Sequence, residues 1–424
     1  MSCVNEFRAY RPRIVDDELR QRLSTIGAVV IEGPRACGKT STARQAAASE
    51  VLLDVDEDAR GIASLDPRLL LEGAVPRLVD EWQIAPAIWN HVRRAVDERS
   101  APGQFILTGS AVPTDDITRH TGAGRISRLR MRPMTLAESG DSSDAISLRE
   151  LFAGKSARAT DPGHDLRRIA ALICRGGWPR LVDQDTAAVT RALSDYLDDV
   201  CRIDVPRVDG HRRDPIRLRR MLSALARNTA TPVALTTLGA DAGGGDGPID
   251  EKTVGSYLDV LERLMVVEHQ PAWAPHLRSR ARLRTTPSRH FVDPSLAAAA
   301  LGAGPETILR DLSLFGLLFE SMVVRDLRVY SQPFDADVFI YNDNTLEVDA
   351  IVVQRGTGHW AAFEIKLGGS WLIDQAAESL IRFRNRLDLS RCGEPACLGV
   401  VVATGYGYRR KDGVEVVPIG ALGP

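Results

Sequence analysis

Eight consecutive residues form a pattern that binds phosphate groups in many proteins. They read Gly33-Pro34-Arg35-Ala36-Cys37-Gly38-Lys39-Thr40, follow the apolar run 28–31 and precede a helix-forming stretch that begins at Ser41. A strand, a glycine-rich turn and a helix in this order surround a phosphate chain with backbone N–H groups. The pattern predicts that residues 33–41 bind a nucleoside triphosphate, with Lys39 on the phosphates and the Thr40 hydroxyl on Mg²⁺. A glycine turn with an incidental lysine is the simpler alternative.

Two acidic residues about forty positions later can complete the same site. The apolar segment 75–79 predicts a strand that ends at Asp80 and Glu81. Asp80 suits the carboxylate on the Mg²⁺ side, and Glu81 suits a base that polarises the attacking water. The next predicted strand, 104–108, ends in small polar residues, of which Thr108 and Ser110 could sense the γ-phosphate or position water. Solvated acids and a plain strand-to-turn boundary are the alternatives.

Arginine is the default cation of this chain, so each lysine stands out. The sequence has five lysines, among them Lys39 and Lys366, against 49 arginines. Arg125 is followed by Arg128, Arg130 and Arg132 at a spacing of two, which predicts one strand face that carries arginines. An arginine near the γ-phosphate, often supplied by a neighbouring subunit, can raise the rate by roughly 10³–10⁵. Arg125 is our candidate for this role, and a solvated or structural arginine is the alternative.

Bulk properties limit the class of protein. A chain of 424 residues is expected to form about two to four domains. The net charge of −2 excludes a globally basic surface, although a local basic face remains compatible with it. No apolar stretch suggests an export signal or a membrane span, and the six scattered cysteines suggest neither disulfides nor a zinc site. We therefore expect a cytoplasmic protein without a membrane partner.

The elements that must position these residues alternate along the first part of the chain. Strands are predicted at 27–32, 51–55, 76–80 and 104–108, with helices at 39–48, near 67–72 and at 86–98 between them. Alternating strands and helices predict an α/β fold with a parallel sheet covered by helices on both faces. Amphipathic helices follow at 166–175 and 187–200. Two further helices, 216–227 and 252–264, precede a strand pair and suggest a helix-turn-helix with a wing.

The wing candidate carries a stripe of positive charge. Arg278, Arg280, Arg282 and Arg284 alternate along an extended segment and therefore share one side of it. Such a stripe suits the phosphate backbone of DNA, and each phosphate neutralised would steepen the salt dependence of binding by about 0.9 in log–log slope. An edge strand protected by charge, or a contact with acidic residues elsewhere, has comparable weight.

Four residues in the C-terminal part could perform phosphodiester chemistry. Glu320 lies on a predicted long helix, Asp349 on the predicted strand 347–353, and Glu364 and Lys366 on one face of the strand 360–366. Two carboxylates can hold Mg²⁺, and an adjacent lysine can orient or activate water. This arrangement resembles the restriction-endonuclease-like core. A nuclease-like fold with ordinary strand-end charges and no cleavage is an equally weighted alternative.

Motifs along nearly the whole chain resemble a prokaryotic family of AAA-type ATPases. They are the phosphate loop, Tyr10-Arg11-Pro12-Arg13, Val79-Asp80-Glu81-Trp82-Gln83, Leu107-Thr108-Gly109-Ser110, Gly124-Arg125-Ile126, Gly176-Gly177-Trp178-Pro179, Phe291-Val292-Asp293-Pro294 and Phe315-Gly316-Leu317-Leu318-Phe319-Glu320. Members carry a C-terminal region of unknown function that combines a winged helix with an endonuclease-like fold. The resemblance implies an ATPase domain at 1–165, a helical lid or connector at 166–213, a winged-helix-like module at 214–300 and a restriction-endonuclease-like domain at 301–424.

Three functions are compatible with these residues. The first is a Mg²⁺-dependent ATPase whose nucleotide state controls how the C-terminal part engages duplex DNA or a protein client. The second is a DNA-processing or defence nuclease in which ATP gates cleavage by Asp349, Glu364 and Lys366. The third is an interaction protein that binds ATP without turnover. An arginine that acts across subunits would in addition require a homo-oligomer.

Overall fold

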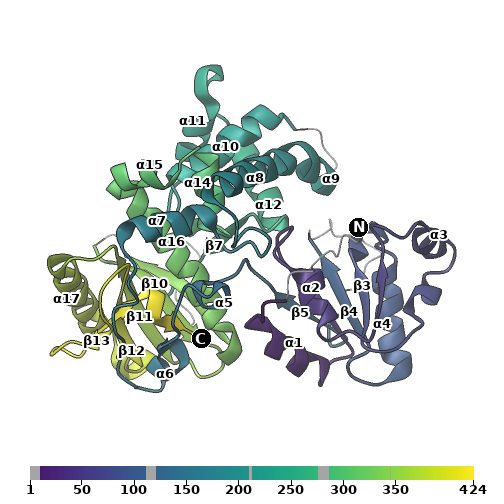
Figure 1. Cartoon of the computed structure of the whole chain (residues 1–424), viewed down its shortest axis with the longest axis horizontal. Helices are drawn as coiled ribbons and strands as arrows, with labels where there is room; N and C mark the ends of the chain where they lie inside the picture. The colour runs from purple at the N-terminus through teal and green to yellow at the C-terminus, as the bar shows by residue number, and fades with distance from the viewer. Residues whose placement is uncertain (1–9, 111–120, 210–212, 276–285, 344) are drawn as a thin grey trace, which may run out of the picture. The chain divides into compact units, whose positions relative to one another are not determined.

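A computed structural model of the chain describes residues 10–110, 121–209, 213–275, 286–343 and 345–424 (Figure 1). Contacts between residues divide the chain into two units. Unit 1 comprises the residues up to 32, 38–109 and 117–131, and unit 2 comprises 33–37, 110–116 and 132–424.

Unit 1 is built on a five-stranded sheet in which all neighbouring strands are parallel, in the order β2-β3-β4-β1-β5. The strands are β1 (Ala28–Glu32), β2 (Ser49–Leu52), β3 (Arg77–Asp80), β4 (Phe105–Gly109) and β5 (Ile126–Arg130). β1 and β4 are apolar along most of their length and buried, which is typical of a parallel sheet covered on both faces. The predicted parallel α/β sheet is therefore confirmed.

Four helices pack around this sheet: α1 (Val15–Leu23), α2 (Lys39–Arg44), α3 (Glu57–Leu65) and α4 (Ile88–Arg99). One face of the sheet forms a core with the apolar sides of α3 and α4, where Trp89 is fully buried. The predicted helix 39–48 is shorter than expected and ends at Arg44. The chain turns there because the Ala48 N–H donates to the Pro76 carbonyl at 2.8 Å, which leads directly into β2.

Unit 2 contains a group of helices: α7 (Leu166–Arg175), α8 (Thr186–Asp199), α9 (Val205–Asp209), α10 (Pro215–Arg227), α11 (Leu235–Gly243), α12 (Glu251–Arg263), α14 (Pro294–Ala300) and α15 (Pro305–Arg310). All residues of α14 are buried, and this helix contacts α7, α8 and α10. An antiparallel strand pair, β7 (Val267–Gln270) and β8 (Ser288–Phe291), follows α12 in the chain order. The predicted order of helices and strands is present, and its description as a winged helix stays a prediction.

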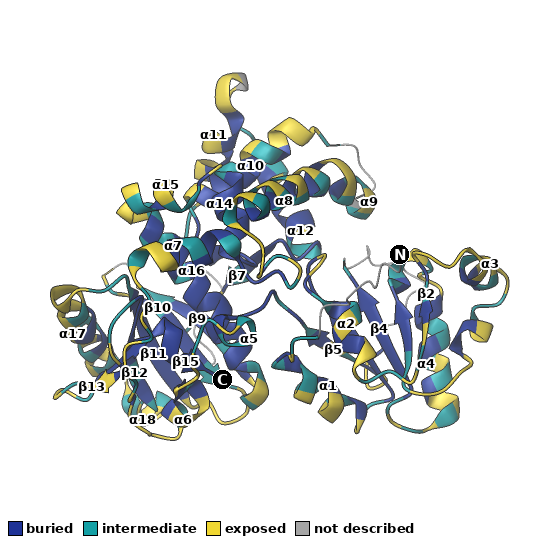
Figure 2. Cartoon of the chain, viewed as in Figure 1, coloured by how far each residue is buried: buried dark blue, intermediate teal, exposed yellow. Residues whose placement is uncertain are grey.

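The C-terminal part of unit 2 is a six-stranded mixed sheet in the order β13-β14-β12-β11-β10-β9. The strands are β9 (Ala336–Asn342), β10 (Glu347–Gln354), β11 (Trp360–Lys366), β12 (Cys397–Val402), β13 (Tyr408–Arg409) and β14 (Glu415–Pro418). Two helices pack against this sheet, α16 (Leu312–Tyr330) and α17 (Ser370–Arg386). Figure 2 shows that β10, β11 and β12 are largely buried, whereas α17 exposes one side.

Residues 132–165 belong to unit 2, although the sequence suggested that the ATPase domain extends to residue 165. β6 (Ile146–Ser147) pairs in parallel with β15 (Leu422–Gly423), and Ala159 bridges to Gly407. The Ser142 hydroxyl also donates to the Leu422 carbonyl at 2.8 Å. These contacts attach the segment to residues near the end of the chain. Unit 1 therefore ends at Met131.

Candidate functional site

The predicted phosphate loop connects β1 to α2. Gly38 adopts φ 105°, a left-handed conformation that favours glycine, immediately before the first residue of α2. Lys39 and Thr40 follow it at the start of the helix; Lys39 is buried and Thr40 is partly exposed. Ser41 is exposed on the same helix. The turn thus brings Lys39 and Thr40 to the carboxyl end of β1.

Asp80 lies next to Thr40. The Thr40 hydroxyl donates to Asp80 Oδ1 at 2.9 Å, and the Thr108 hydroxyl donates to the same oxygen. This proximity follows from the strand order β3-β4-β1, because the carboxyl ends of parallel neighbours meet at one edge of the sheet. Asp80 and Thr108 are both buried. A carboxylate and a hydroxyl at this distance are suitable ligands for one hard cation.

Glu81 is held in a left-handed turn immediately after β3, with φ 53° and ψ 46°. Its backbone N–H donates to the Thr108 hydroxyl at 3.3 Å, and Gln83 Nε2 donates to its carboxylate. Gly109 lies beside this turn, where a Cβ atom would come within 2.8 Å of Gln83 Oε1. Gln83 and Gly109 therefore position Glu81. Neither residue was given a role from the sequence, although Gln83 closely follows the acidic end of β3 and Gly109 directly follows Thr108 in β4.

The remaining residues of the predicted loop are grouped with unit 2 by their contacts. Gly33, Pro34 and Cys37 are buried, whereas Ala36 is exposed. Arg35 is half-exposed, and its guanidinium lies 3.3 Å from Asp199 and 3.7 Å from Asp204. Arg35 thus forms ion pairs with the last residue of α8 and with the segment that follows this helix. Ser110, the residue after β4, is partly exposed and is also grouped with unit 2.

Arg125 lies at the end of the sheet where the strands begin, whereas Lys39 lies at the end where they finish. It precedes β5, whose first residue pairs with Ala28 at the amino end of β1, whereas Lys39 follows the carboxyl end of β1. Its Nε lies 2.8 Å from Asp97 Oδ1. Arg125 is therefore not placed to contact phosphates bound at Lys39 of its own chain. A role across a subunit contact stays a prediction.

The four predicted residues of the C-terminal cluster come together in unit 2. Lys366 Nζ lies 3.0 Å from Asp349 Oδ2 and 2.7 Å from Glu364 Oε2. The antiparallel register of β10 and β11, in which Ala350 pairs with Phe363, produces this proximity. Asp349 Oδ2 also accepts a hydrogen bond from the Ile365 N–H at 2.7 Å. An ammonium group thus bridges two carboxylates.

Burial and mutual repulsion shift the pKa values in this cluster. Burial, followed by the Asp349 carboxylate, raises the pKa of Glu364. Burial and then Asp349 also raise the pKa of Glu320, which lies on α16. Burial alone would lower the pKa of Lys366, but Asp349 and Glu364 raise it overall. Lys366 is therefore a stable cation, and the two glutamates hold protons more strongly than exposed glutamates do.

Two further predictions concern metal-binding side chains and the arginine stripe. The described residues contain no group of three or more His, Cys, Asp or Glu side chains placed to hold a metal ion. The arginine stripe Arg278, Arg280, Arg282 and Arg284 lies outside the described residues.

None of the helices that the structure describes could span a membrane.

Comparisons with known protein families divide the chain into three parts. Residues 26–139 match the model of the AAA domain. This part of the chain is similar to AAA-type P-loop ATPases. Residues 166–307 and 315–422 match two different domains of unknown function. The ATPase similarity therefore covers the Thr40–Asp80 cluster, while neither of the other two matches assigns a function to unit 2.

Similar proteins give little further information on function. Uncharacterized proteins of Mycobacterium tuberculosis and Mycobacterium bovis are each 24% identical over 405 residues, which is 94% of this chain and 82% of the relative. Among solved structures, a Walker-type ATPase of Pyrococcus abyssi has 14% identity and a TM-score of 0.42, covering 67% of this chain and 94% of that chain. The ORC2 protein of Aeropyrum pernix has 12% identity and a TM-score of 0.33, covering 71% and 92%.

Proposed function

We propose that the chain is a Mg²⁺-dependent ATPase. The observation that supports this proposal most directly is the hydrogen bond between Thr40 and Asp80, which joins the phosphate loop to the acidic strand end. Lys39 and the N–H groups of residues 33–41 would bind the phosphates, and Thr40 and Asp80 would hold Mg²⁺. The ion would neutralise charge on the phosphates when bound.

In this mechanism Glu81 accepts a proton from the water that attacks the γ-phosphate. Gln83 and the Thr108 hydroxyl fix the Glu81 turn, and Thr108 also orients Asp80. Side chains held in this way lose little freedom during the reaction, which is how positioning lowers a barrier. We further propose that the nucleotide state controls how unit 2 engages duplex DNA or a protein client. Arg125 of a neighbouring subunit is the candidate arginine finger in a homo-oligomer.

The ATPase proposal is tested with the full chain, by measuring nucleotide affinity and phosphate release with Mg²⁺. Lys39→Ala should abolish nucleotide binding, and Glu81→Gln should keep binding while it slows phosphate release by at least about a hundredfold. Lys155→Ala and Glu57→Gln are matched controls, because both side chains are largely exposed and pair only on the surface. If Glu81→Gln releases phosphate at the normal rate, the hydrolytic role is wrong, and binding without turnover becomes the better description.

Cleavage of nucleic acid by unit 2 is a second candidate function. The specific observation in its favour is the pair of contacts from Lys366 to Asp349 and Glu364, since these three groups could hold a cation and orient water against a phosphodiester. Linear, circular and single-stranded substrates with Mg²⁺ or Mn²⁺ and ATP would test it. Lys366→Ala should abolish cleavage, and the exposed Lys252→Ala should not. Absence of nicking by the wild-type chain would exclude this function.

The arginine stripe gives a separate test of duplex binding. Replacing Arg278, Arg280, Arg282 and Arg284 together by alanine should weaken duplex affinity and reduce the log–log salt slope by up to about 3.6, if each arginine neutralises one phosphate. Unchanged affinity would remove the wing from the proposal without affecting the ATPase.

A further inference from the structure

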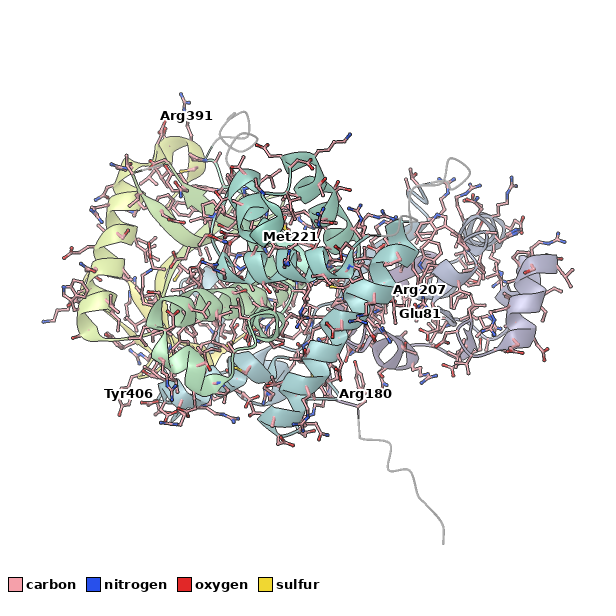
Figure 3. The ribbon with its side chains drawn as sticks, turned by 90° about the horizontal axis from the view of Figure 1, so that it is seen from above. Glu81, Arg180, Arg207, Met221, Arg391 and Tyr406 are labelled. Carbon is pink, nitrogen blue, oxygen red and sulfur yellow. The ribbon has the colours of Figure 1, made fainter. Side chains whose placement is uncertain are left out.

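Four large apolar side chains are exposed together near one end of the C-terminal sheet. The exposed fractions are 66% for Trp371, 36% for Leu372, 64% for Tyr406 and 43% for Tyr408. Trp371 and Leu372 lie in the first turn of α17, whereas Tyr406 and Tyr408 follow β12. We call these four residues the aromatic surface. Figure 3 labels Tyr406, whose side chain lies at the margin of the drawn ribbon.

The two segments lie side by side. β11 and β12 are parallel neighbours in which Lys366 pairs with Val402, so the loops after both strands leave the same edge of the sheet. A Cβ atom on Gly368 would lie 3.5 Å from Thr404 Oγ1, which shows how closely these loops approach. Arg410 also forms an ion pair with Asp374, one helical turn after Trp371. Trp371 is therefore on the side of α17 that faces the segment 404–410.

Three basic residues, two of them in ion pairs, border the aromatic surface. The segment that carries both tyrosines continues as Arg409-Arg410-Lys411. Arg410 is neutralised by Asp374 and Asp412, and Arg409, which keeps half of its side chain exposed, pairs with Glu415 at 3.4 Å. Lys411 is exposed. Aromatic rings interleaved with cations suit a strand that presents bases on one side and phosphates on the other.

The aromatic surface is close to the Lys366 cluster along the chain. Lys366 is the last residue of β11, and only residues 367–369 separate it from α17, the helix that begins with Ser370 and Trp371. Glu364 shares its face of β11 with Ala362 and Trp360, which pack in one core with α17 residues. A strand bound across the aromatic surface would therefore have phosphates near the groups that could act on them.

We propose that the aromatic surface binds single-stranded nucleic acid, with bases stacked on Trp371 and Tyr406 and phosphates near Lys411. Unpaired bases expose flat faces that can stack on these rings, whereas the bases of a duplex are already stacked on one another. The inference goes beyond the proposed ATPase and does not require cleavage. It is tested by binding alone, so the failure of either proposed activity would leave it intact.

The experiment measures fluorescence anisotropy of a labelled oligothymidylate of about 20 nucleotides with the full chain, and of a duplex of equal length. Trp371→Ala and Tyr406→Ala should each weaken single-strand binding about tenfold, and Trp371→Phe should retain most of it. Lys411→Ala should weaken binding less and reduce its salt dependence. Leu65→Ala, an exposed apolar residue of unit 1, is the control and should change nothing.

Three results would overturn the proposal. The first is no binding of oligothymidylate by the wild-type chain at low salt. The second is equal single-strand affinity for the wild type, Trp371→Ala and Tyr406→Ala. The third is a loss of self-association in sedimentation with unchanged oligonucleotide affinity, because the aromatic surface would then be a contact between copies of this chain. Thermal denaturation of each variant, with Trp371→Phe as reference, separates loss of binding from loss of folding.

Discussion

The Thr108 hydroxyl offers a stringent test of the proposed ATPase mechanism. This side chain is fully buried at the end of β4, donates to Asp80 and accepts from the Glu81 N–H at 3.3 Å. Thr108→Val keeps nearly the same shape and volume but removes both hydrogen bonds. The substitution therefore changes the polar contacts of Asp80 and Glu81 without opening a cavity.

The size of the effect follows from the hydrogen bond to a carboxylate. Such a bond contributes about 1.5–3 kcal/mol, and weakening the part-buried contact of the Glu81 N–H adds to the cost. If this energy is lost in the transition state, turnover falls roughly 10- to 150-fold, since each 1.4 kcal/mol corresponds to about a factor of ten. Nucleotide affinity should change little, because Lys39 and the loop backbone are untouched.

The assay is phosphate release at saturating ATP and Mg²⁺, together with nucleotide affinity, for Thr108→Val and Thr108→Ser. Serine keeps the hydroxyl, so its turnover should stay within about threefold of the wild type, allowing for one lost methyl group. Equal turnover of the valine and serine variants would refute the reasoning, because the hydroxyl would then have no part in positioning Asp80 or Glu81.

Two further predictions concern the site and unit 2. Gly109→Ala should displace Gln83 and slow ATP turnover about tenfold. Gly61→Ala is the control, because a Cβ atom there meets no other atom within 4 Å; it should leave turnover unchanged and stabilise its helix slightly. Measurements of ATP turnover and of melting temperature distinguish the two variants. Burial and Asp349 raise the pKa of Glu320, so its contribution to stability is present at low pH and is lost as the pH rises through the raised value. The melting temperature of unit 2 should therefore fall as the pH rises above the ordinary range of a glutamate, more steeply for the wild type than for Glu320→Gln. Equal slopes would contradict this.

The sequence predicted that Thr40 and Asp80 share one site, because Thr40 begins a helix after a glycine-rich turn and Asp80 ends a strand. Thr108 stands near the end of the next strand. The alternation of strands and helices implies parallel strands, and parallel neighbours bring their carboxyl ends to one edge. Local pattern and strand direction were therefore sufficient. The same reasoning succeeded for Asp349, Glu364 and Lys366, because a short antiparallel connection largely determines which residues of two strands are neighbours.

Other features depend on contacts that no local pattern encodes. Arg125 was chosen from its motif. The end of the sheet at which it lies depends on the pairing of β5 with β1, and most of unit 1 separates these two strands in the sequence. The short β6 pairs with β15, almost the whole of unit 2 away in sequence. A strand of two residues has no periodicity to detect. No local pattern therefore indicated that residues near 146 pair with the end of the chain.

A buried network of charges in unit 2 explains why the chain joins that unit at Arg132. Arg132 and Arg328 both pair with Glu268, each at 2.9 Å, and all three side chains are largely buried. Removing one partner of a buried ion pair typically costs about 3–5 kcal/mol, so Arg132 is held firmly within unit 2. Two residues after Glu268, Gln270 donates to the Asp349 carbonyl at 2.8 Å. The position of Asp349 is therefore fixed by a strand outside its own sheet, so the C-terminal cluster depends on the packing of β7 as well as on the strands that carry its carboxylates.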